Sequence, residues 1–303
     1  MICGSSFAPA GNPPILGNQR TFYPRYPKTN SMTIKSHKTI TVVPYDTAWP
    51  EQFEQEAALI KQALGIHCLE IHHVGSTAVP GLAAKPVIDI IAVVENQEAS
   101  IAPLQVAGYQ HKGEYNIPLR AFFNKNDGLN RINLHVYPQD HPERELNLTF
   151  RNYLRANPDA VTAYAKLKYD LLSKTQLFAK YPSGFTDYTL GKHAFIQAIL
   201  TKAGFNRIRM TYVTHHNEWE AAKNFRRIHF LRQGLTDPFS RIEPSANHRH
   251  LALYQGAIIV GYSHVELLPE GRTRMHMIEL EESHAHLRQQ FLDLCTVWLT
   301  NRD

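Results

Sequence analysis

A turn of small residues precedes an apolar strand that carries one acid, in residues 74–91 (VGSTAVPGLAAKPVIDII). Because Gly75 has no side chain and Ser76 has only a short hydroxyl, the backbone N–H groups of such a turn can approach a phosphate closely. The other residues of the strand around Asp89 are apolar, and a carboxylate buried there without a partner would be costly. Asp89 therefore binds a metal or cation at a ligand site, or it pairs structurally with Lys85, an arginine or a nearby loop.

The composition favours a small anionic ligand over a nucleic-acid surface. The 303 residues carry a formal net charge of +5 and a pI near 9.0, with Lys and Arg spread along the chain. We expect a nucleotide or another phosphate-bearing small molecule as the partner, and no nucleic acid.

The chain has no apolar run of about 18 residues and no signal-peptide pattern. Its three cysteines, Cys3, Cys68 and Cys295, are far apart. These features predict a cytoplasmic chain with no membrane span, no disulfide framework and no Cys-based metal site.

Length and pattern predict a leader and two domains. Residues 1–32 are rich in Gly, Pro, Ser and Asn and are predicted to be disordered, as a floppy tail or a start-site artefact. Residues 33–205 are predicted to form the first domain and residues 210–303 the second.

Apolar spacing predicts the elements of the first domain. Helices are predicted over residues 49–64 and 101–107, with a helix break at Asn157-Pro158 and a C-cap at Gly204. The predicted strands are TITVVPYD, CLEIHHVG, PVIDIIAVV and INLHVYP.

The pattern restarts after residue 207 as strand, amphipathic helix, hairpin, strand and terminal helix. The helix is predicted to end at Gly234, and the hairpin to turn at Gln255-Gly256. This order predicts a second α+β domain.

The spacing of Gly75-Ser76, twelve residues and then Asp89 resembles the motif of the nucleotidyltransferase superfamily. The blocks HHVGSTAVPGLAAKPVIDI, RINLHVYP, LTFRNYLRANPDAVTAYAKLK and YTLGKHAFIQAIL look like the GrpB family, which is also found appended to some dephospho-coenzyme A kinases. The resemblance covers residues 39–203. It implies an α+β or α/β fold class, with a nucleotidyltransferase-like domain built on a mixed sheet.

Active members of that superfamily hold Mg²⁺ and a nucleoside triphosphate with two acids two residues apart and a third on a neighbouring strand. The resemblance thus implies Asp89 as catalytic residue and metal ligand, with Mg²⁺ and a nucleoside triphosphate bound. In this sequence Ile91 occupies the position of the second acid. The nearest candidate on the neighbouring strand is His135, whose imidazole suits zinc better than magnesium. One carboxylate makes a weak Mg²⁺ site, so conventional two-metal transfer is not expected.

The same blocks imply cations that neutralise a phosphate, and Arg can grip one bidentately. Taken singly, each is better explained as an exposed surface charge; taken together with the Gly-Ser turn, the two interpretations are equally supported. The predicted phosphate-binding residues are Gly75, Ser76, Lys85, Arg120, Arg131, His135 and Lys192, with Lys125 as a further cation. The tandem His72-His73 is predicted to be structural, because neighbouring strand residues face opposite sides.

The element order of the second domain resembles the N-terminal two thirds of the Gcn5-related N-acetyltransferase (GNAT) family. AAKNFRRIHFLRQGLTDPF, HLALYQGAIIVGYSHVELL and RMHMIELEESHAHLRQQFLDLCTVWL carry this likeness. In that family a glycine turn at a helix start binds the coenzyme A pyrophosphate; here ESHAHLRQQF takes that place, and no glycine follows Gly271. The chain stops at Asp303, which implies an incomplete GNAT-like domain whose sheet edges a second copy or a partner would cover.

The polar residues of this domain are predicted to be solvated. His248 with His250, and His284 with His286, would each share one face of a strand, but no Cys or carboxylate has a zinc-like spacing with them. Glu279 and Glu281 are read either as a catalytic base or as an exposed acidic rim.

Three functions remain open. The first is a GrpB module that binds a nucleotide or another phosphate, with or without weak nucleotidyl transfer. The second is an acyl-CoA-dependent N-acetyltransferase that uses acetyl-CoA. The third is a non-catalytic interaction or accessory module, because a fold does not by itself deliver a function.

Overall fold

The computed structural model describes residues 15–16 and 36–300, with gaps at 115–116, 127, 129–130, 176, 181–185, 215, 239–240, 243, 246 and 270–271. The leader predicted over residues 1–32 lies outside the described residues, except for the short strand β1 (Ile15–Leu16). That strand pairs antiparallel with Thr273 and Arg274 of the second domain. No helix in the described part of the chain is long and apolar enough to cross a membrane.

The first domain is built on a mixed five-stranded sheet in the order β3-β4-β7-β6-β5, in which β4 and β7 are parallel and the other neighbours antiparallel. Its strands are β3 (Cys68–Val74), β4 (Ile88–Val94), β5 (Gln110–His111), β6 (Ala121–Asn126) and β7 (Arg131–Pro138).

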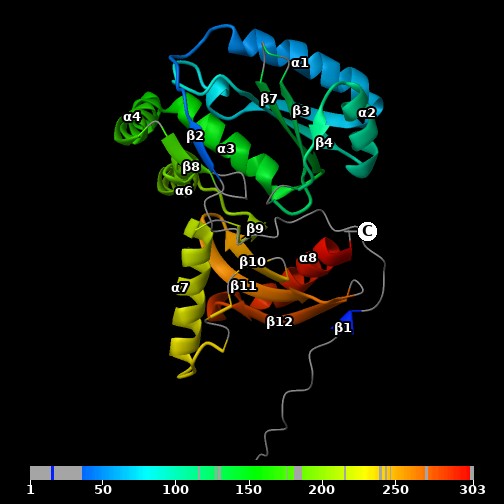
Figure 1. The fold of residues 1–303 in the computed structure, drawn as a ribbon, viewed down its shortest axis with the longest axis vertical. Helices are drawn as coiled ribbons and strands as arrows, with labels where there is room; N and C mark the ends of the chain where they lie inside the picture. The colour runs from blue at the N-terminus through cyan, green and yellow to red at the C-terminus, as the bar shows by residue number, and fades with distance from the viewer. Residues whose placement is uncertain are drawn as a thin grey trace, which may run out of the picture.

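Helices cover both faces of this sheet (Figure 1). One face packs on α1 (Trp49–Leu64) and α2 (Ile101–Val106), where Ile90 belongs to the main apolar core. The other face, which includes Ile91, packs on α3 (Pro142–Ala156). Because side chains alternate along a strand, Asp89 faces the α3 side, together with Ile91.

A helical layer flanks that side, with a two-stranded antiparallel sheet of β2 and β8 beside it (Figure 1). Small apolar clusters hold this layer, including the stacked rings of Tyr164 and Phe195. Its elements are β2 (Ser36–Thr39), α4 (Pro158–Lys174), β8 (Leu177–Lys180), α5 (Asp187–Leu190) and α6 (His193–Lys202).

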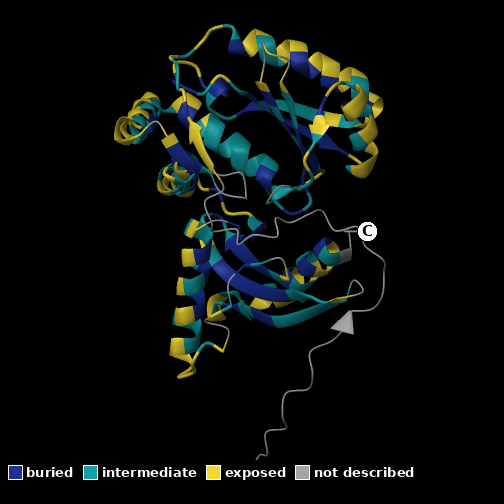
Figure 2. Cartoon of the chain, in the orientation of Figure 1, coloured by how far each residue is buried: buried dark blue, intermediate teal, exposed yellow. Residues whose placement is uncertain are grey.

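The second domain has an antiparallel sheet in the order β12-β11-β10-β9, with β1 on its far edge. One face packs on α7 through Trp219 and Phe225, and the other on α8 through Phe291 and Trp298. The sheet is mostly buried between these helices (Figure 2). The elements are β9 (Ile208–Tyr212), α7 (His216–Arg232), β10 (His248–Gln255), β11 (Ile258–Leu267), β12 (Thr273–Leu280) and α8 (Arg288–Thr300).

Most predicted elements form, with one clear exception. The helix predicted over 49–64 has these bounds, and α3 and α4 meet at Asn157-Pro158. The prediction of one strand over TITVVPYD is wrong: β2 ends at Thr39, and after it only Val43 pairs, in a single bridge with Ala84. The next residue is Pro44, which lacks the N–H that a longer ladder needs.

Candidate functional site

The Gly-Ser turn and Asp89 lie side by side. Strand β3 ends at Val74, Gly75 has φ +72°, and a short 3₁₀ turn follows over Ser76–Ala78. A Cβ atom added to Gly75 would lie 2.5 Å from Oδ2 of Asp89. The backbone of the turn thus rests directly against the carboxylate, and only glycine leaves room for that approach.

The Asp89 carboxylate is partly exposed and is not enclosed by hydrocarbon. Asn133, its register partner on β7, donates from Nδ2 to Oδ1 at 2.8 Å. His135 Nε2 lies 4.0 Å from the same oxygen. The side chain of Asp89 is 30% exposed, so it has a hydrogen-bonded partner and still reaches solvent.

Three lysines from separate segments surround the turn. Lys168 on α4 is 1% exposed and donates to Ser76 Oγ at 2.8 Å and to the Ala83 carbonyl at 2.7 Å. Lys85 and Lys192 both lie over the Tyr188 ring, with Nζ 4.6 Å and 5.0 Å from its centroid. Lys168 thus contacts the Gly-Ser turn, and Lys85 and Lys192 lie near enough to act electrostatically on Lys168.

Burial of these lysines strongly disfavours their charged form. It lowers the pKa of Lys168 to about 6, and the charges of Lys192 and Lys85 lower it further. The pKa of Lys85 falls to about 7 through burial and repulsion from Lys192 and Lys38, and that of Lys192 to about 8 through burial. The negative charge of Asp89 raises the pKa of both Lys85 and Lys192 and so offsets part of this effect. The site holds more positive charge than one carboxylate balances, which is typical of functional sites.

The other predicted phosphate-binding residues are divided between the site and its surroundings. Arg131 begins β7, is exposed, and acts electrostatically on Lys85 and Lys38. Arg120 is 5% exposed and bonds through NH1 to His135 Nδ1 at 3.1 Å, behind the ring edge that faces Asp89. His135 and Arg120 thus support the carboxylate from inside the sheet layer.

Lys125 lies on the opposite face of the sheet and pairs with Glu56 of α1 at 2.7 Å. Lys125 and Arg131 are both on the β6–β7 hairpin, but the alternation of side chains sends Lys125 towards α1. It is not part of the Asp89 site.

The donor set around Asp89 does not fit a resident Mg²⁺ ion. The position two residues further on is Ile91, which is fully buried, and Asn133 presents an N–H rather than an oxygen to the carboxylate. Within the described ranges no three His, Cys, Asp or Glu side chains are grouped to hold a metal. We derive no metal-dependent step for these residues, because Mg²⁺ requires several oxygen ligands.

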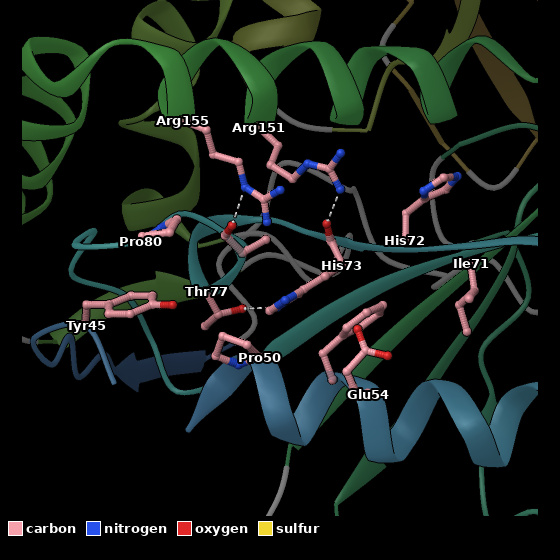
Figure 3. Close-up of a pocket in the computed structure, with 12 residues that line it drawn as sticks. Tyr45, Pro50, Glu54, Ile71, His72, His73, Thr77, Pro80, Arg151 and Arg155 are labelled. Carbon is pink, nitrogen blue, oxygen red and sulfur yellow. Dashed lines mark hydrogen bonds between the residues drawn. The ribbon is translucent and has the colours of Figure 1, made fainter. Parts of the chain in front are cut away.

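A pocket of about 290 Å³ opens on the other side of the same turn, between α1 and α3 (Figure 3). Arg151 and Arg155 extend into it from successive turns of α3. On its floor, His73 stacks on Phe53 with ring centroids 4.8 Å apart and bonds through Nε2 to Thr77 Oγ1 at 3.0 Å. His73 is thus buried and held on the α1 side, while His72 pairs with Glu70 at 2.7 Å; both have the structural contacts that were predicted.

Two histidines of the second domain that were predicted to be solvated lie in its sheet. His250 is 2% exposed, and its Nδ1 bonds to the Tyr262 hydroxyl. His248 is half-buried, with Nδ1 2.9 Å from His264 Nε2. The prediction of solvated rings is wrong for His250 because both faces of its central strand are covered by helices.

The remaining polar residues predicted at this domain have other settings. His284 and His286 lie on a 3₁₀ turn over Glu282–Leu287, not on a strand, and His286 is exposed. Glu279 lies 3.1 Å from His229 Nε2 on α7. To act as a catalytic base, Glu279 would have to break its contact with His229.

The sequence profile described as GrpB protein matches residues 39–202, which include β3, β4, β7, the Gly-Ser turn and the three lysines. The chain belongs to the GrpB family. The match ends before the second domain, so the GNAT-like character of residues 210–303 stays a prediction.

Two GrpB relatives and one solved GrpB structure show the extent of the similarity. The chain is 33% identical over 189 residues to the UPF0157 protein YqkA of Bacillus subtilis, covering 60% of this chain and 53% of that one. It is 40% identical over 171 residues to the UPF0157 protein PA4798 of Pseudomonas aeruginosa, covering 54% and 67%. The crystal structure of conserved protein GrpB from Enterococcus faecalis is 38% identical and covers 54% of this chain and 96% of that one, with a TM-score of 0.47. The matched region thus spans about half the length of the Bacillus relative.

The sequence prediction missed Lys168, although it lies inside a GrpB-like block. Its partner Ser76 is 92 positions away, and the helical spacing of AYAKLKYD does not distinguish Lys168 from Lys166. Lys166 is 74% exposed and pairs with Asp170, whereas Lys168 is buried. Lys168 lies four residues after Tyr164, which belongs to the buried face of α4, and that offset was the available signal.

Proposed function

We propose that the GrpB-family domain binds the phosphate groups of a nucleotide or another phosphate ligand against the Gly-Ser turn. The observation that carries the proposal is the convergence of Lys85, Lys168 and Lys192 on Ser76 and Asp89. Holding three ammonium groups together in a half-buried place is unfavourable without a counter-charge. A phosphate supplies that charge and accepts hydrogen bonds from the same groups.

Each residue has a distinct part in this proposal. The Lys85 and Lys192 ammonium groups donate to phosphate oxygens, and the N–H groups of the turn approach closely because Gly75 has no side chain. Lys168 holds the Ser76 hydroxyl in place and adds charge behind it. Asp89 balances part of the lysine charge before the ligand binds, and Asn133 fixes the orientation of the carboxylate.

The test is a titration of ATP, GTP, pyrophosphate and inorganic phosphate by calorimetry, each with and without Mg²⁺. Lys168→Met should weaken binding by about tenfold or more, because a charge-assisted contact network is lost. Lys166→Met, two residues away on the exposed side of α4, should leave binding unchanged. Absence of binding by all four ligands would refute the proposal.

Asp89→Ala separates two roles of the carboxylate. If Asp89 balances the lysines, the variant should bind free phosphate ligands as well as or better than the parent protein, with or without Mg²⁺. A loss of binding confined to the Mg²⁺ arm would instead assign Asp89 to a metal brought in by the nucleotide.

Residual nucleotidyl transfer is the finer form of the proposal. It would appear as pyrophosphate release from a nucleoside triphosphate that depends on Asp89. The absence of a second carboxylate at Ile91 argues against a fast reaction.

Acyl transfer by the second domain is the competing proposal, and an accessory role without catalysis is the third. The position of a glycine turn before α8 is occupied by the 3₁₀ turn over Glu282–Leu287, which has no glycine. Acetyl-CoA carries phosphate groups of its own, so it is titrated into both the parent protein and Lys168→Met. Micromolar binding that Lys168→Met retains would favour acyl transfer by the second domain. An accessory role would follow if neither acetyl-CoA nor any phosphate ligand bound.

A further inference from the structure

We propose that the pocket between α1 and α3 is a second anion site. It would take a small molecule that carries a phosphate or carboxylate on a planar or apolar body. The site is separate from the Gly-Ser turn lysines and does not depend on their function.

Two guanidinium groups of the pocket are preorganised. Arg151 NH1 donates to the His73 carbonyl at 2.7 Å, and Arg155 Nε donates to the Ala78 carbonyl at 2.8 Å (Figure 3). Both side chains are thereby stretched from α3 across the pocket to the end of β3 and the turn after it. Little side-chain freedom remains to be lost when a ligand binds.

Arg151 and Arg155 have N–H donors that no described residue uses. A guanidinium has five N–H donors. Contacts to His73 and Asn152 use three on Arg151, and the contact to Ala78 uses one on Arg155. Among the residues that the structure describes, two donors on Arg151 and four on Arg155 thus remain for a ligand.

The residues that line the pocket carry a net positive charge. Within the described chain, neither Arg151 nor Arg155 has a carboxylate within 4.0 Å, whereas Arg144 on the same helix is paired with Glu70 at 2.5 Å. His73 between them stays neutral, because burial, together with these two arginines, lowers its pKa to about 4. One carboxylate, Glu54, lines the pocket, so the lining has a surplus of one positive charge.

The walls of the pocket determine which class of ligand fits. Phe53, Tyr45, Pro50 and Pro80 supply aromatic and ring surfaces to the lining of the pocket. The volume of about 290 Å³ is at the lower limit of small-molecule pockets. An inorganic anion alone would leave those walls bare, and a monoanion or phosphate monoester with a ring would cover them.

The pocket and the Asp89 site share one connecting segment. Gly75 lies against Asp89 and Ser76 contacts Lys168, while Thr77, Ala78 and Pro80 line the pocket. Asp89 raises the pKa of His73, whereas Arg151 and Arg155 lower it, so both sites act on one ring. A ligand in the pocket is therefore within electrostatic reach of the carboxylate.

The experiment follows the Nε–H signals of Arg151 and Arg155 by ¹⁵N NMR in the full chain. The signals are assigned by their loss in Arg151→Gln and Arg155→Gln. Phenyl phosphate, benzoate and phenol are titrated in turn. We expect phenyl phosphate or benzoate to shift both signals with a single dissociation constant, and the stronger of the two identifies the anion. Phenol should have no effect.

Three variants make the result specific. Arg155→Gln should weaken binding about tenfold. Arg227→Gln makes the same charge change at an exposed position of α7 and should leave binding unchanged. Glu54→Gln should tighten binding about threefold, an increase that unfolding cannot mimic. Lys168→Met should leave these signals and their titration unchanged, so failure of the lysine site and failure of the pocket are distinguishable.

Two results would overturn the proposal. One is the absence of any shift of the Arg151 and Arg155 signals at tens of millimolar of both anions. The other is an equal effect of Arg155→Gln and Arg227→Gln, which would reduce the binding to non-specific attraction by a basic protein.

Discussion

At the scale of single residues, the Asp89 site is defined by lysines whose burial disfavours their charged form. Lys168 shows this most clearly, because it is fully buried beside Ser76 and has no carboxylate partner within 4.0 Å among the described residues. Its two hydrogen bonds go to neutral oxygens, Ser76 Oγ and the Ala83 carbonyl. A buried ammonium held in this way reduces stability in its charged form.

We therefore expect the unbound protein to gain stability as the pH rises. The pKa of Lys168 is lowered from 10.5 to about 6 in the folded protein, so between these values the unfolded chain binds more protons. Stability then increases with pH across this range, and below about pH 6 the full cost of the charge is present. Urea unfolding at several pH values from 6 to 9 measures the slope.

Lys168→Met should flatten that slope, and Lys166→Met should not, since Lys166 is exposed and paired with Asp170. Equal slopes in Lys168→Met and the parent protein would contradict the assigned pKa. Saturating phosphate ligand should also flatten the slope, because the ligand stabilises the charged lysines.

The residues of the site could be predicted from sequence only where they belong to a local motif. Gly75, Ser76 and Asp89 were found because a turn and a strand place them at a fixed short spacing. Lys168 was missed because its place depends on the packing of α4 against a turn 92 residues away. Arg120 was predicted as a phosphate ligand, but its contact with His135 arises from a hairpin pairing that spacing alone does not show.

At the scale of elements, the turn after β3 works because β3 and β4 are adjacent antiparallel strands. Val74 is opposite Asp89 in that pairing, so the residue after Val74 must pass the Asp89 side chain. Gly75 does so with φ +72°.

Gly75→Ala should destabilise the domain and disturb the site. The new Cβ would lie 2.5 Å from Asp89 Oδ2, in addition to the strain of a positive φ. Gly81→Ala is the matched control, because Gly81 has φ +76° and open space around its would-be Cβ. We expect Gly81→Ala to cost about 1 kcal/mol and Gly75→Ala at least 1 kcal/mol more, measured by urea unfolding.

The collision with Asp89 can be isolated in a double-mutant cycle. Gly75→Ala should cost less in an Asp89→Ala background, because the clashing oxygen is gone. An unchanged cost in that background would show that backbone strain alone explains the effect.

Elements were predictable where apolar periodicity or a breaking residue was clear, as for α1 and the α3–α4 junction at Pro158. Strand β6 was not predicted, although Ala121, Phe122 and Phe123 are buried in the sheet. Its polar second half, Asn124 to Asn126, hides the strand pattern. The pairing order of the strands is a non-local property, and the sequence carries no spacing signal for it.

At the scale of the whole molecule, an acidic residue of the first domain makes hydrogen bonds to the core of the second. Glu114, in the segment after β5, accepts hydrogen bonds at Oε2 from the Tyr212 hydroxyl and, at 3.4 Å, from Trp298 Nε1. Both partners belong to the core of the second domain. The main-chain carbonyl of Glu114 accepts from Arg120 Nε at 3.1 Å.

This contact connects the second domain with the candidate site. Arg120 bonds to His135, and His135 faces Asp89, so hydrogen bonds and one 4.0 Å contact lead from Trp298 to the carboxylate. Two ion pairs cross the same interface, Arg209 with Glu143 and Arg207 with Glu145. The second domain thus has a structural role for the first, whether or not it has a ligand of its own.

Glu114→Ala should uncouple the domains. It removes a carboxylate that accepts from the Leu119 N–H at 2.7 Å and from two almost fully buried side chains, Tyr212 at 3% and Trp298 at 0% exposure. Each lost contact of a buried donor costs about 1–3 kcal/mol. We expect the thermal unfolding midpoint of the second domain to fall. Calorimetric unfolding of the whole chain should then separate into two transitions. The main-chain carbonyl that accepts from Arg120 Nε remains in this variant, but the Leu119 N–H beside Arg120 loses its acceptor, Glu114 Oε1. Phosphate affinity should therefore fall as well, because the segment that carries Arg120 is less firmly held.

Glu145→Ala is the control for this interface. Its pair with Arg207 is exposed, at 46% and 43% for the two side chains, so its loss should change stability by less than about 1 kcal/mol. If Glu114→Ala lowered the midpoint no more than Glu145→Ala, the coupling would have to come from apolar contact between the domains. If it split the transition without changing phosphate affinity, Glu114 would join the domains without positioning Arg120 for the site.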